Sequence, residues 1–547
     1  CIIGIKVSAH PADERRKCFM EQCVLKIKDN GQEKSIPFTP PARLSELFSK
    51  HGIAVEMPCG GRQRCLKCKV EATGSLSPMS EREISLLTEK EKAENIRYAC
   101  MATALGDVQA RLLSGRYRDD ILTEGRLPLF ELKPWGRDYG AAVDIGTTTV
   151  AAYLYRLSDG KLLKTLAEKN PQSVYGADVL SRLQKSIEGE RKGLADSIRG
   201  CISRIISEFC AFAGIPAEKL DSLVLTGNTA MLYLLCGRDP QSIAVAPFEQ
   251  DCDFGFFLDG QKLDLPGNIR VYLPKCISAY VGADITTALL ASEFFQQGKV
   301  VSDRPRLLVD IGTNGEMALA ADGALLCCST AAGPAFEGAG IHQGMPARTG
   351  AIYRISFENH RIKTAVLGGG QAVGICGSGL LDAVSVMCEA GIVDQTGIIC
   401  EDGHDFTEYV KEINGQPAFE LPGTGVLLTQ QDIRSVQLAK SAICAGMKTL
   451  IKEAGYDFDD IGELVIAGGF GSNINVKSAE RIGLIPPGFA DKAYAIGNAA
   501  GSGASMILLS DTLRIQSEQI KSNTKTLGLS TNPFFMESYI DGMFFPE

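Results

Sequence analysis

Four cysteines in the first hundred residues have a spacing that suits a metal cluster. Cys59, Cys65 and Cys68 form a C-x5-C-x2-C run, and Cys100 follows some thirty residues later. Iron in a [2Fe–2S] cluster takes four thiolates, and the plant-type pattern is C-x4-C-x2-C with a distant fourth cysteine. The first gap here is one residue longer. The spacing therefore predicts a [2Fe–2S] cluster, with a structural zinc site as the alternative.

The elements around these cysteines would position them for such a cluster. Gly60 and Gly61 follow Cys59, and glycine lets a backbone wrap closely around a metal group. Residues 23–37 predict a β-hairpin, since they contain Asn-Gly between alternating apolar residues. A helix is expected at about 41–51. The hairpin, the helix and the lack of a second C-x2-C pair favour iron over zinc.

A second chemistry is indicated by a sequence that occurs twice. An apolar strand runs into VDIGTTT at 143–149, and LVDIGTNGE repeats the pattern at 308–316. A Gly–Thr turn presents N–H groups and hydroxyls to phosphate oxygens, and an aspartate at the strand end can hold Mg²⁺, usually through water. One copy alone would more often be an ordinary hairpin. Two copies predict two similar lobes whose loops clamp a triphosphate.

A third element is LVIAGGFGSNIN at 464–475. A buried strand is expected to run into Gly468 and Gly469, where glycine permits close approach of the backbone to a base or ribose. The alternative is a strand-to-helix turn without a ligand. Helices rich in small residues are expected at 226–235 and 497–509, where two lobes could pack closely near a hinge.

Composition limits the setting in which this chemistry takes place. The net charge is −9 and no cluster of Lys and Arg forms a nucleic-acid footprint, which argues against a nucleic-acid partner. No apolar stretch is long enough to predict a membrane span, and the start does not predict a signal peptide. Most of the 18 cysteines stand singly in apolar segments, as buried thiols do. A reducing, anaerobic cytoplasm is expected.

A chain of 547 residues is too long for one ordinary domain. The motifs and breaks predict a multidomain α/β protein. The expected parts are an N-terminal extension (1–22), a [2Fe–2S] domain (23–114), a Pro- and Gly-broken linker (115–137), a first ATPase lobe (138–303) and a second lobe with a C-terminal tail (304–547).

Together the ATP elements resemble the superfamily of acetate and sugar kinases, heat-shock protein 70 and actin. Residues 144–149 look like its first phosphate loop, 310–316 like its second and 467–471 like its adenosine motif. With a plant-like [2Fe–2S] domain in front, residues 23–547 are similar to the reductive activators of corrinoid proteins. The resemblance implies a β-grasp, ferredoxin-like domain joined to a two-lobed ATPase.

The resemblance also implies a function. Members of that family use ATP to drive one electron from the cluster to cob(II)alamin on a partner, which restores the cob(I)alamin used in methyl transfer. The implied partners are a corrinoid protein of a methyltransferase system and an upstream electron donor of low potential. A homodimer is implied as well.

Roles follow for individual residues. Cys59, Cys65, Cys68 and Cys100 would carry the electron, and Asp144 and Asp310 would hold Mg²⁺. Glu316 would orient the attacking water, or would be a carboxylate at the rim. Asp284 would face the cleft, or would only complement a helix N-terminus. The residues expected to contact nucleotide are Gly146, Thr147, Thr148, Gly312, Thr313, Asn314 and Gly315 at the phosphates, and Gly468 and Gly469 at the base.

Two other functions remain open from sequence. The chain could donate electrons with ATP to another low-potential enzyme, such as a dehydratase. It could also be a small-molecule kinase that carries a redox domain. A kinase would need a general base and a substrate pocket between the lobes, and the sequence identifies neither.

Overall fold

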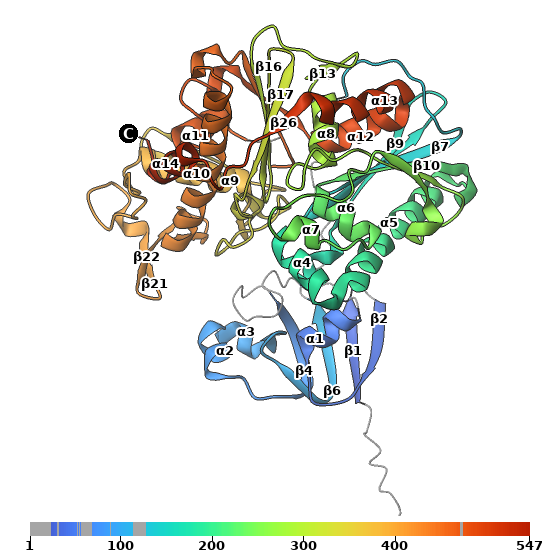
Figure 1. The fold of residues 1–547 in the computed structure, drawn as a ribbon. Helices are drawn as coiled ribbons and strands as arrows, with labels where there is room; N and C mark the ends of the chain where they lie inside the picture. Colours follow the sequence, from blue (N-terminus) through green and yellow to red (C-terminus); the bar gives the residue numbers. More distant parts are fainter. Residues whose placement is uncertain are drawn as a thin grey trace, which may run out of the picture. The chain divides into compact units, whose positions relative to one another are not determined.

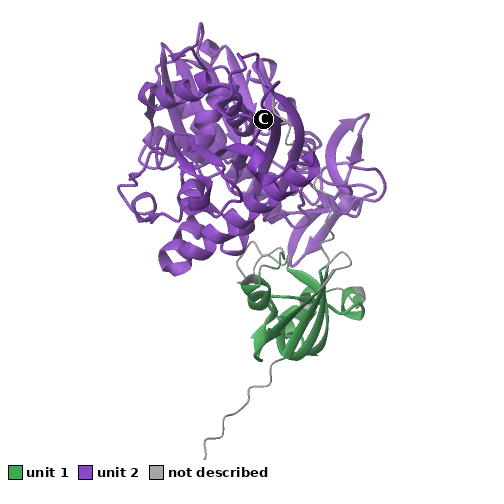
Figure 2. Cartoon of the chain, turned by 90° about the vertical axis from the view of Figure 1, so that its right-hand side faces the viewer, with its two compact units in different colours: residues 1–57, 61–115 green, residues 58–60, 116–547 purple. Residues whose placement is uncertain are grey.

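The structure is a computed structural model that describes residues 23–29, 32–51, 53, 55, 68–87, 89–112, 127–470 and 474–546. Its elements are labelled in Figure 1. The chain forms two compact units, residues 1–57 with 61–115 and residues 58–60 with 116–547 (Figure 2). Within the described ranges, no helix has the length and apolar character needed to cross a membrane.

The first unit is a mixed sheet with the strand order β2-β1-β6-β4-β5, and β3 pairs with β6. β1 runs parallel to β6 and antiparallel to β2, which confirms the predicted hairpin. Alternate residues of β1, Leu25 and Ile27, are buried with Phe48 of α1 in one core. This is the expected β-grasp arrangement. Its elements are β1 (Cys23–Asp29), β2 (Gln32–Phe38), β3 (Ala42–Arg43), α1 (Leu44–Lys50), β4 (Lys69–Leu76), α2 (Glu81–Leu86), α3 (Glu89–Ala93), β5 (Ile96–Tyr98) and β6 (Thr103–Leu112).

A buried ion pair fixes the segment that leads to Cys100. Arg97 donates from Nε and Nη2 to the two carboxylate oxygens of Glu83, at 3.0 and 2.9 Å. The backbone N–H of Tyr98 donates to the same carboxylate at 2.9 Å. Glu83 is completely buried, so these bonds replace the water that its charge loses.

The first lobe of the second unit is a six-stranded sheet with the order β11-β12-β10-β7-β8-β9. β7 and β8 form an antiparallel hairpin, and β10 runs parallel to β7 on its other side. The long helix α5 buries Ile198, Ile202 and Phe209 against this sheet. The elements used below are β7 (Tyr139–Ile145), β8 (Thr149–Arg156), β9 (Lys161–Lys169), α4 (Val179–Lys185), α5 (Arg191–Ala213), β10 (Leu220–Gly227), α6 (Thr229–Cys236), β11 (Phe256–Asp259), β12 (Arg270–Leu273) and α8 (Ala283–Ala291).

The second lobe has the order β25-β24-β15-β16-β17-β26 and repeats five strands of this plan, while its sixth strand, β26, lies at the opposite edge of the sheet from β11. β15 and β16 form the hairpin, and β24 runs parallel to β15. The duplicated motif is therefore a duplicated structure, and the two-lobed ATPase fold is confirmed. Its elements are β15 (Arg306–Ile311), β16 (Gly315–Ala321), β17 (Ala324–Thr330), η5 (Ala335–Glu337), α9 (Gly377–Glu389), α10 (Gln430–Glu453), β24 (Glu463–Ala467), β25 (Ala493–Gly497), α12 (Ala499–Leu509), α13 (Asp511–Ile520), β26 (Thr524–Thr526) and α14 (Pro533–Asp541).

The lobes meet where α8 packs on α12 (Figure 1). Gly503 of α12 lies so close to α8 that a Cβ there would be 1.9 Å from the carbonyl oxygen of Thr287. The predicted small-residue helix at 497–509 thus pairs with α8, whereas α6 packs on α5.

The segment that enters the second unit also attaches to α12. The backbone N–H of Lys133 donates to the carbonyl of Leu509 at 2.9 Å, and that of Asp511 donates to the carbonyl of Lys133 at 2.8 Å. The indole of Trp135 donates to the carbonyl of Ile507 at 3.2 Å. Residues from 127 onward are described within the region expected to link the domains, and these contacts fix their end to the C-terminal half of α12.

Candidate functional site

The two aspartates of the repeated motif lie at the ends of matching strands. In the first lobe, Asp144 of β7 is level with Thr226 of β10. In the second, Asp310 of β15 is level with Ala467 of β24. The carboxyl ends of parallel strands meet at one edge of a sheet, which is where ligands bind in such folds. Each aspartate is therefore next to the turn that follows its neighbouring strand.

Gly468 makes room for Asp310. A Cβ at this position would be 2.6 Å from Asp310 Oδ1, and the backbone has φ +93°, which side chains rarely tolerate. Gly469 is exposed, and a Cβ there would meet no atom within 4 Å. The next residue, Phe470, stacks on Phe336 with ring centroids 4.9 Å apart. Of the predicted adenosine motif, residue 471 lies outside the described residues.

Both phosphate loops are closed by their own backbone. Gly146 donates to the carbonyl of Thr149 at 2.9 Å, and Gly312 donates to that of Asn314 at 3.0 Å. Asn170 holds the first loop from behind. Its side chain donates to the carbonyl of Gly146 and its backbone N–H to that of Thr148, both at 2.8 Å. None of these hydrogen bonds uses a threonine hydroxyl, so the hydroxyls of the loops can bind other groups.

Glu337 joins the two loops. The Thr313 hydroxyl donates to Oε1 of Glu337 at 2.7 Å, and the Thr148 hydroxyl donates to Oε2. Thr148 belongs to the first lobe, and Thr313 and Glu337 belong to the second. The predicted phosphate-binding threonines of both lobes therefore face one point. Sequence reasoning missed Glu337, which lies in AAGPAFEG and matches no part of the repeat.

Two asparagines at helix N-termini complete the site. Asn228 caps α6 and donates from its amide to the Thr147 hydroxyl at 3.3 Å. Asn498 caps α12 and donates to Asp144 Oδ2 at 2.9 Å. Both follow a glycine with positive φ at the end of a strand, Gly227 and Gly497. This repeated Gly-Asn is a sequence signal that could have found them.

Carboxylates gather between the lobes. Burial raises the pKa of Asp144 to about 6 and that of Asp284 to about 7. The pKa of Asp310 rises to about 8 through burial and through repulsion by Asp284 and Asp144. The pKa of Glu316 rises through burial and through repulsion by Asp284 and Asp310. Such a group of like charges favours a bound cation.

The placement of the two less certain carboxylates is now clear. Asp284 lies in the first turn of α8, where its carboxylate accepts from the backbone N–H of Ile285 at 2.8 Å. It also repels Asp310 and Glu316, so it faces the same site. Glu316 is 8% exposed and accepts from the Asn314 amide at 3.3 Å. Glu316 is therefore not a carboxylate at the rim, and Asp284 both lies at a helix N-terminus and faces the other carboxylates.

These four carboxylates are not a direct metal-ligand set. In the described ranges, no three His, Cys, Asp or Glu side chains stand close enough to ligate one metal ion directly. Mg²⁺ usually keeps several of its waters and takes only one or two carboxylates. The arrangement therefore fits a hydrated Mg²⁺ bound together with a nucleotide.

Two of the four predicted cluster ligands are described in the first unit. The Sγ atoms of Cys68 and Cys100 are 3.2 Å apart and both residues are 1% exposed. The backbone N–H of Cys100 points to the Cys68 sulfur at 3.5 Å. Sulfur atoms this close, with an N–H directed at one of them, fit two thiolates on one iron–sulfur group. Cys59 and Cys65 lie outside the described residues.

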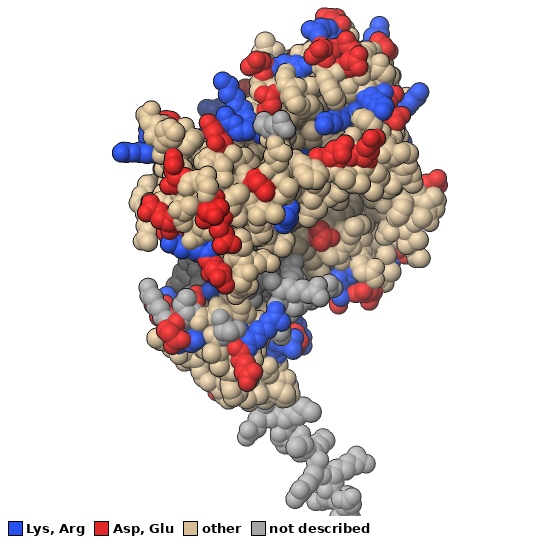
Figure 3. Space-filling view, turned by 90° about the vertical axis from the view of Figure 1, so that its left-hand side faces the viewer, with Lys and Arg blue, Asp and Glu red and all other residues tan. Residues whose placement is uncertain are grey.

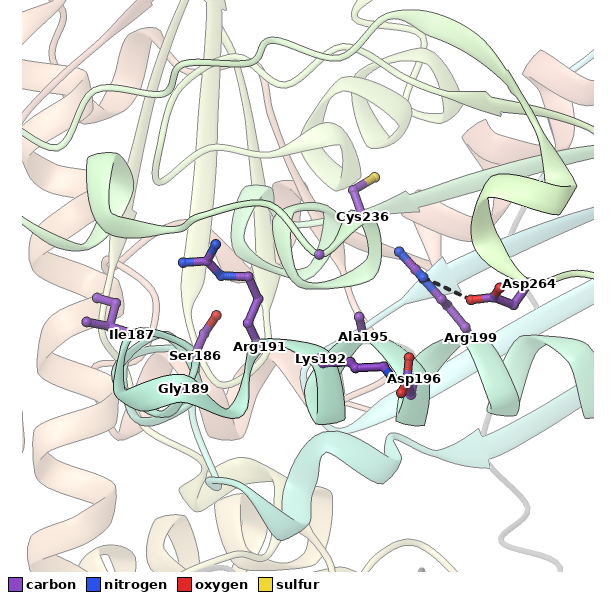
Figure 4. A pocket seen from close by; sticks show the side chains of 11 residues that line it. Ser186, Ile187, Gly189, Arg191, Lys192, Ala195, Asp196, Arg199, Cys236 and Asp264 are labelled. Atoms are coloured by element: carbon purple, nitrogen blue, oxygen red, sulfur yellow. Dashed lines mark hydrogen bonds and ion pairs between the residues drawn. The ribbon is translucent and has the colours of Figure 1, made fainter.

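Two further features, the surface charge and a hollow beside α5, do not point to the candidate nucleotide site. On the face drawn in Figure 3, Lys and Arg are intermixed with Asp and Glu. A hollow of about 560 Å³ lies beside the start of α5 (Figure 4). Two of its arginines are already paired, Arg199 with Asp264 at 3.0 Å and Arg191 with Asp239 at 2.8 Å. None of the sequence-predicted residues lines it.

Two lobes of the same topology, with paired phosphate loops and connecting helices between them, define the acetate and sugar kinase, heat-shock protein 70 and actin class. Comparison with known proteins agrees. The family model described as the C-terminal domain of RACo, the ASKHA domain, matches residues 304–547, and that of the RACo middle region matches residues 139–297.

Similar proteins define the family further. The corrinoid activation enzyme RamQ of Eubacterium limosum is 35% identical over 425 residues, 75% of this chain and 70% of that protein. The Co(II) methylated amine-specific corrinoid protein reductase of Methanosarcina barkeri is 26% identical over 397 residues, 66% of this chain and 68% of that protein. The solved structure of a reductive activator for corrinoid, iron–sulfur protein superposes with a TM-score of 0.70 at 26% identity, over 96% of this chain and 98% of that one. The chain belongs to the RACo family of corrinoid activators.

Proposed function

We propose that this chain uses ATP to drive the one-electron reduction of cob(II)alamin to cob(I)alamin on a corrinoid protein. The observation that carries the proposal is that one chain combines the Cys68–Cys100 sulfur pair with two phosphate loops that meet at Glu337. Membership of the RACo family, whose relatives carry names of corrinoid activation and reduction, supports it.

The chemistry explains why the two units are joined. When bound, a [2Fe–2S] cluster on Cys59, Cys65, Cys68 and Cys100 would supply a one-electron carrier, with a potential near about −400 mV if it is of the plant type. In the resting ligation state, cob(I) is a stronger reductant than such a cluster, so electron transfer from the cluster to cob(II) is uphill. Each 59 mV uphill costs about tenfold in the equilibrium constant.

ATP can supply that drive because it binds between two lobes. The roles proposed for this chain are that Asp144 and Asp310 hold a hydrated Mg²⁺, while the Gly146–Thr148 and Gly312–Gly315 loops bind the phosphates. Gly468 and Gly469 let the base approach, and Glu316 orients the attacking water. A ligand that binds one arrangement of the lobes more tightly shifts the population toward it.

Finer points belong to the same proposal. The corrinoid partner would serve a methyltransferase, an upstream donor of low potential would reduce the cluster, and the protein would act in the cytoplasm as a homodimer. The alternatives are ATP-driven electron donation to another low-potential enzyme and phosphorylation of a small molecule.

The experiment that tests the function mixes the reduced protein, Mg·ATP and a corrinoid protein in the cob(II) state, and follows the absorbance of cob(I). We expect cob(I) to form only when ATP and magnesium are both present. The matched control is the Asp310→Asn protein with the same partner. Formation of cob(I) at the same rate without ATP would contradict the proposal, and phosphorylation of a sugar or acid would favour the kinase.

A further inference from the structure

Arg182 of α4 is a buried cation that forms no ion pair with any of the residues that the structure describes. It is completely buried, and its Nε donates to the carbonyl of Gly176 at 2.9 Å. Nη1 contacts only the sulfur of Met231, at 3.6 Å, and Nη2 has no hydrogen-bond partner in the part of the chain that the structure describes. Asp178 on the same helix accepts instead from the backbone N–H of Ser181. A guanidinium is costly to bury in this way, so the position requires an explanation.

Arg182 is connected to the first phosphate loop through two side chains. The Met231 sulfur that it contacts also accepts from the Asn170 amide, at 3.7 Å. That amide donates to the carbonyl of Gly146, and the backbone N–H of Asn170 donates to the carbonyl of Thr148. The side chains of Met231 and Asn170 therefore link the guanidinium to the loop.

Glu337 is the anion on the other side of that loop. Its carboxylate accepts from the hydroxyls of Thr148 and Thr313. Burial lowers the pKa of Arg182 to about 10, and the negative charges of Asp178 and Glu337 oppose that effect. The three side chains that favour negative charge here are thus Arg182 and the two threonines.

We propose that Thr148, Thr313 and Arg182 form one anion site, and that the Glu337 carboxylate and the terminal phosphate of ATP compete for it. The two hydroxyls already donate to one acceptor, and two anions at one point would repel each other. ATP would displace Glu337 from Thr148 and so break a bond between the lobes. ADP, which lacks that phosphate, would leave the bond in place. This inference rests on the proposed function, because it assumes that ATP binds at the two loops.

The test measures the affinities of Mg·ATP and Mg·ADP for the full-length protein by isothermal titration calorimetry. We expect Glu337→Gln to bind Mg·ATP about tenfold more tightly, since the competing charge is gone, and Arg182→Met to bind it about tenfold less tightly. Neither change should alter the affinity for Mg·ADP by more than about threefold. Arg182→Lys, which keeps the charge, should lie between Arg182→Met and the unmodified protein.

Matched controls remove exposed charges from elsewhere in the same unit. Glu358→Gln breaks an exposed pair with Lys363, and Arg204→Met breaks one with Glu168, so neither should change nucleotide affinity. Weaker ATP binding by Glu337→Gln would overturn the competition. If Arg182→Met lowers the affinities for Mg·ATP and Mg·ADP equally, Arg182 only supports the fold. If Arg182→Met does not fold, the affinities of Arg182→Lys and Glu337→Gln for Mg·ATP still test the proposal. If the unmodified protein binds neither nucleotide, the proposed function itself fails.

Discussion

The side-chain amide of Asn498 donates a hydrogen bond of 2.9 Å to Asp144, which is 354 residues away in the chain. The same asparagine accepts from the backbone N–H of Gly501 at 2.7 Å and so caps α12. One side chain therefore connects the helix between the lobes to the first aspartate of the site.

Asn498→Asp should separate the two roles of this residue. Aspartate caps helices as well as asparagine does, but it cannot donate to Asp144 and adds a like charge. We expect α12 to keep its cap and ATP-dependent cob(I) formation to fall clearly. Asn498→Ala, which also removes the cap, should lose roughly 1 kcal/mol of stability in addition. Full activity in Asn498→Asp would show that its bond to Asp144 has no role.

Asp310→Asn should raise the stability of the protein and lower its activity. At pH 8 and above, where Asp310 carries its charge, removing that charge relieves the repulsion with Asp144 and Asp284, so the protein without magnesium should melt at a higher temperature. ATP-dependent reduction should fall by about a hundredfold or more, because a metal ion contributes several kcal/mol to such chemistry. Calorimetric melting and the cob(I) assay measure the two effects. A variant that is both less stable and fully active would contradict both expectations.

Stability without magnesium should decrease as pH rises. The folded-state pKa values of Asp144, Asp284 and Asp310, about 6, 7 and 8, lie above the ordinary value of 3.8. Between pH 4 and 8 the folded protein then binds more protons than the unfolded chain, so the free energy of unfolding falls as pH rises. In EDTA we expect the second unit to melt several degrees lower at pH 8 than at pH 6, and Mg·ATP to restore more stability at pH 8. Asp310→Asn should show a smaller pH dependence.

Two adjacent glycines offer a matched pair of variants. Gly468→Ala would place a methyl group 2.6 Å from Asp310 Oδ1 at φ +93°, which costs on the order of 1–3 kcal/mol. Gly469→Ala would meet no atom within 4 Å and should melt like the unmodified protein. If Gly469 lines the base, Gly469→Ala should still bind ATP more weakly. Equal melting temperatures for the two variants would contradict the role assigned to Gly468.

The cluster assignment can be tested at a described cysteine. Cys68→Ser should lose the visible and EPR spectra of a [2Fe–2S] centre, because its sulfur is one of the four proposed ligands. Cys444→Ser replaces a buried thiol of α10 and should keep both spectra. Unchanged spectra in Cys68→Ser would contradict the assignment.

The sequence predicted what depends on short-range pattern. A strand that ends in Asp-x-Gly-Thr is local, so both hairpins were placed correctly, and so was the hairpin at the N-terminus. Glu337, Arg182 and the Asn498 contact were missed, because each acquires its meaning from a partner far away in the chain. The segment before Cys100 contains two short helices, α2 and α3. Helix propensity is weak over so few residues.

The attachment of the incoming chain to α12 has a geometric consequence. α12 has 11 residues, about 16 Å at 1.5 Å per residue. Asn498 holds one end at Asp144, and Lys133 and Trp135 are bonded to the other end. One helix length therefore separates Asp144 from the point at which residues 133–135 are attached to the second unit.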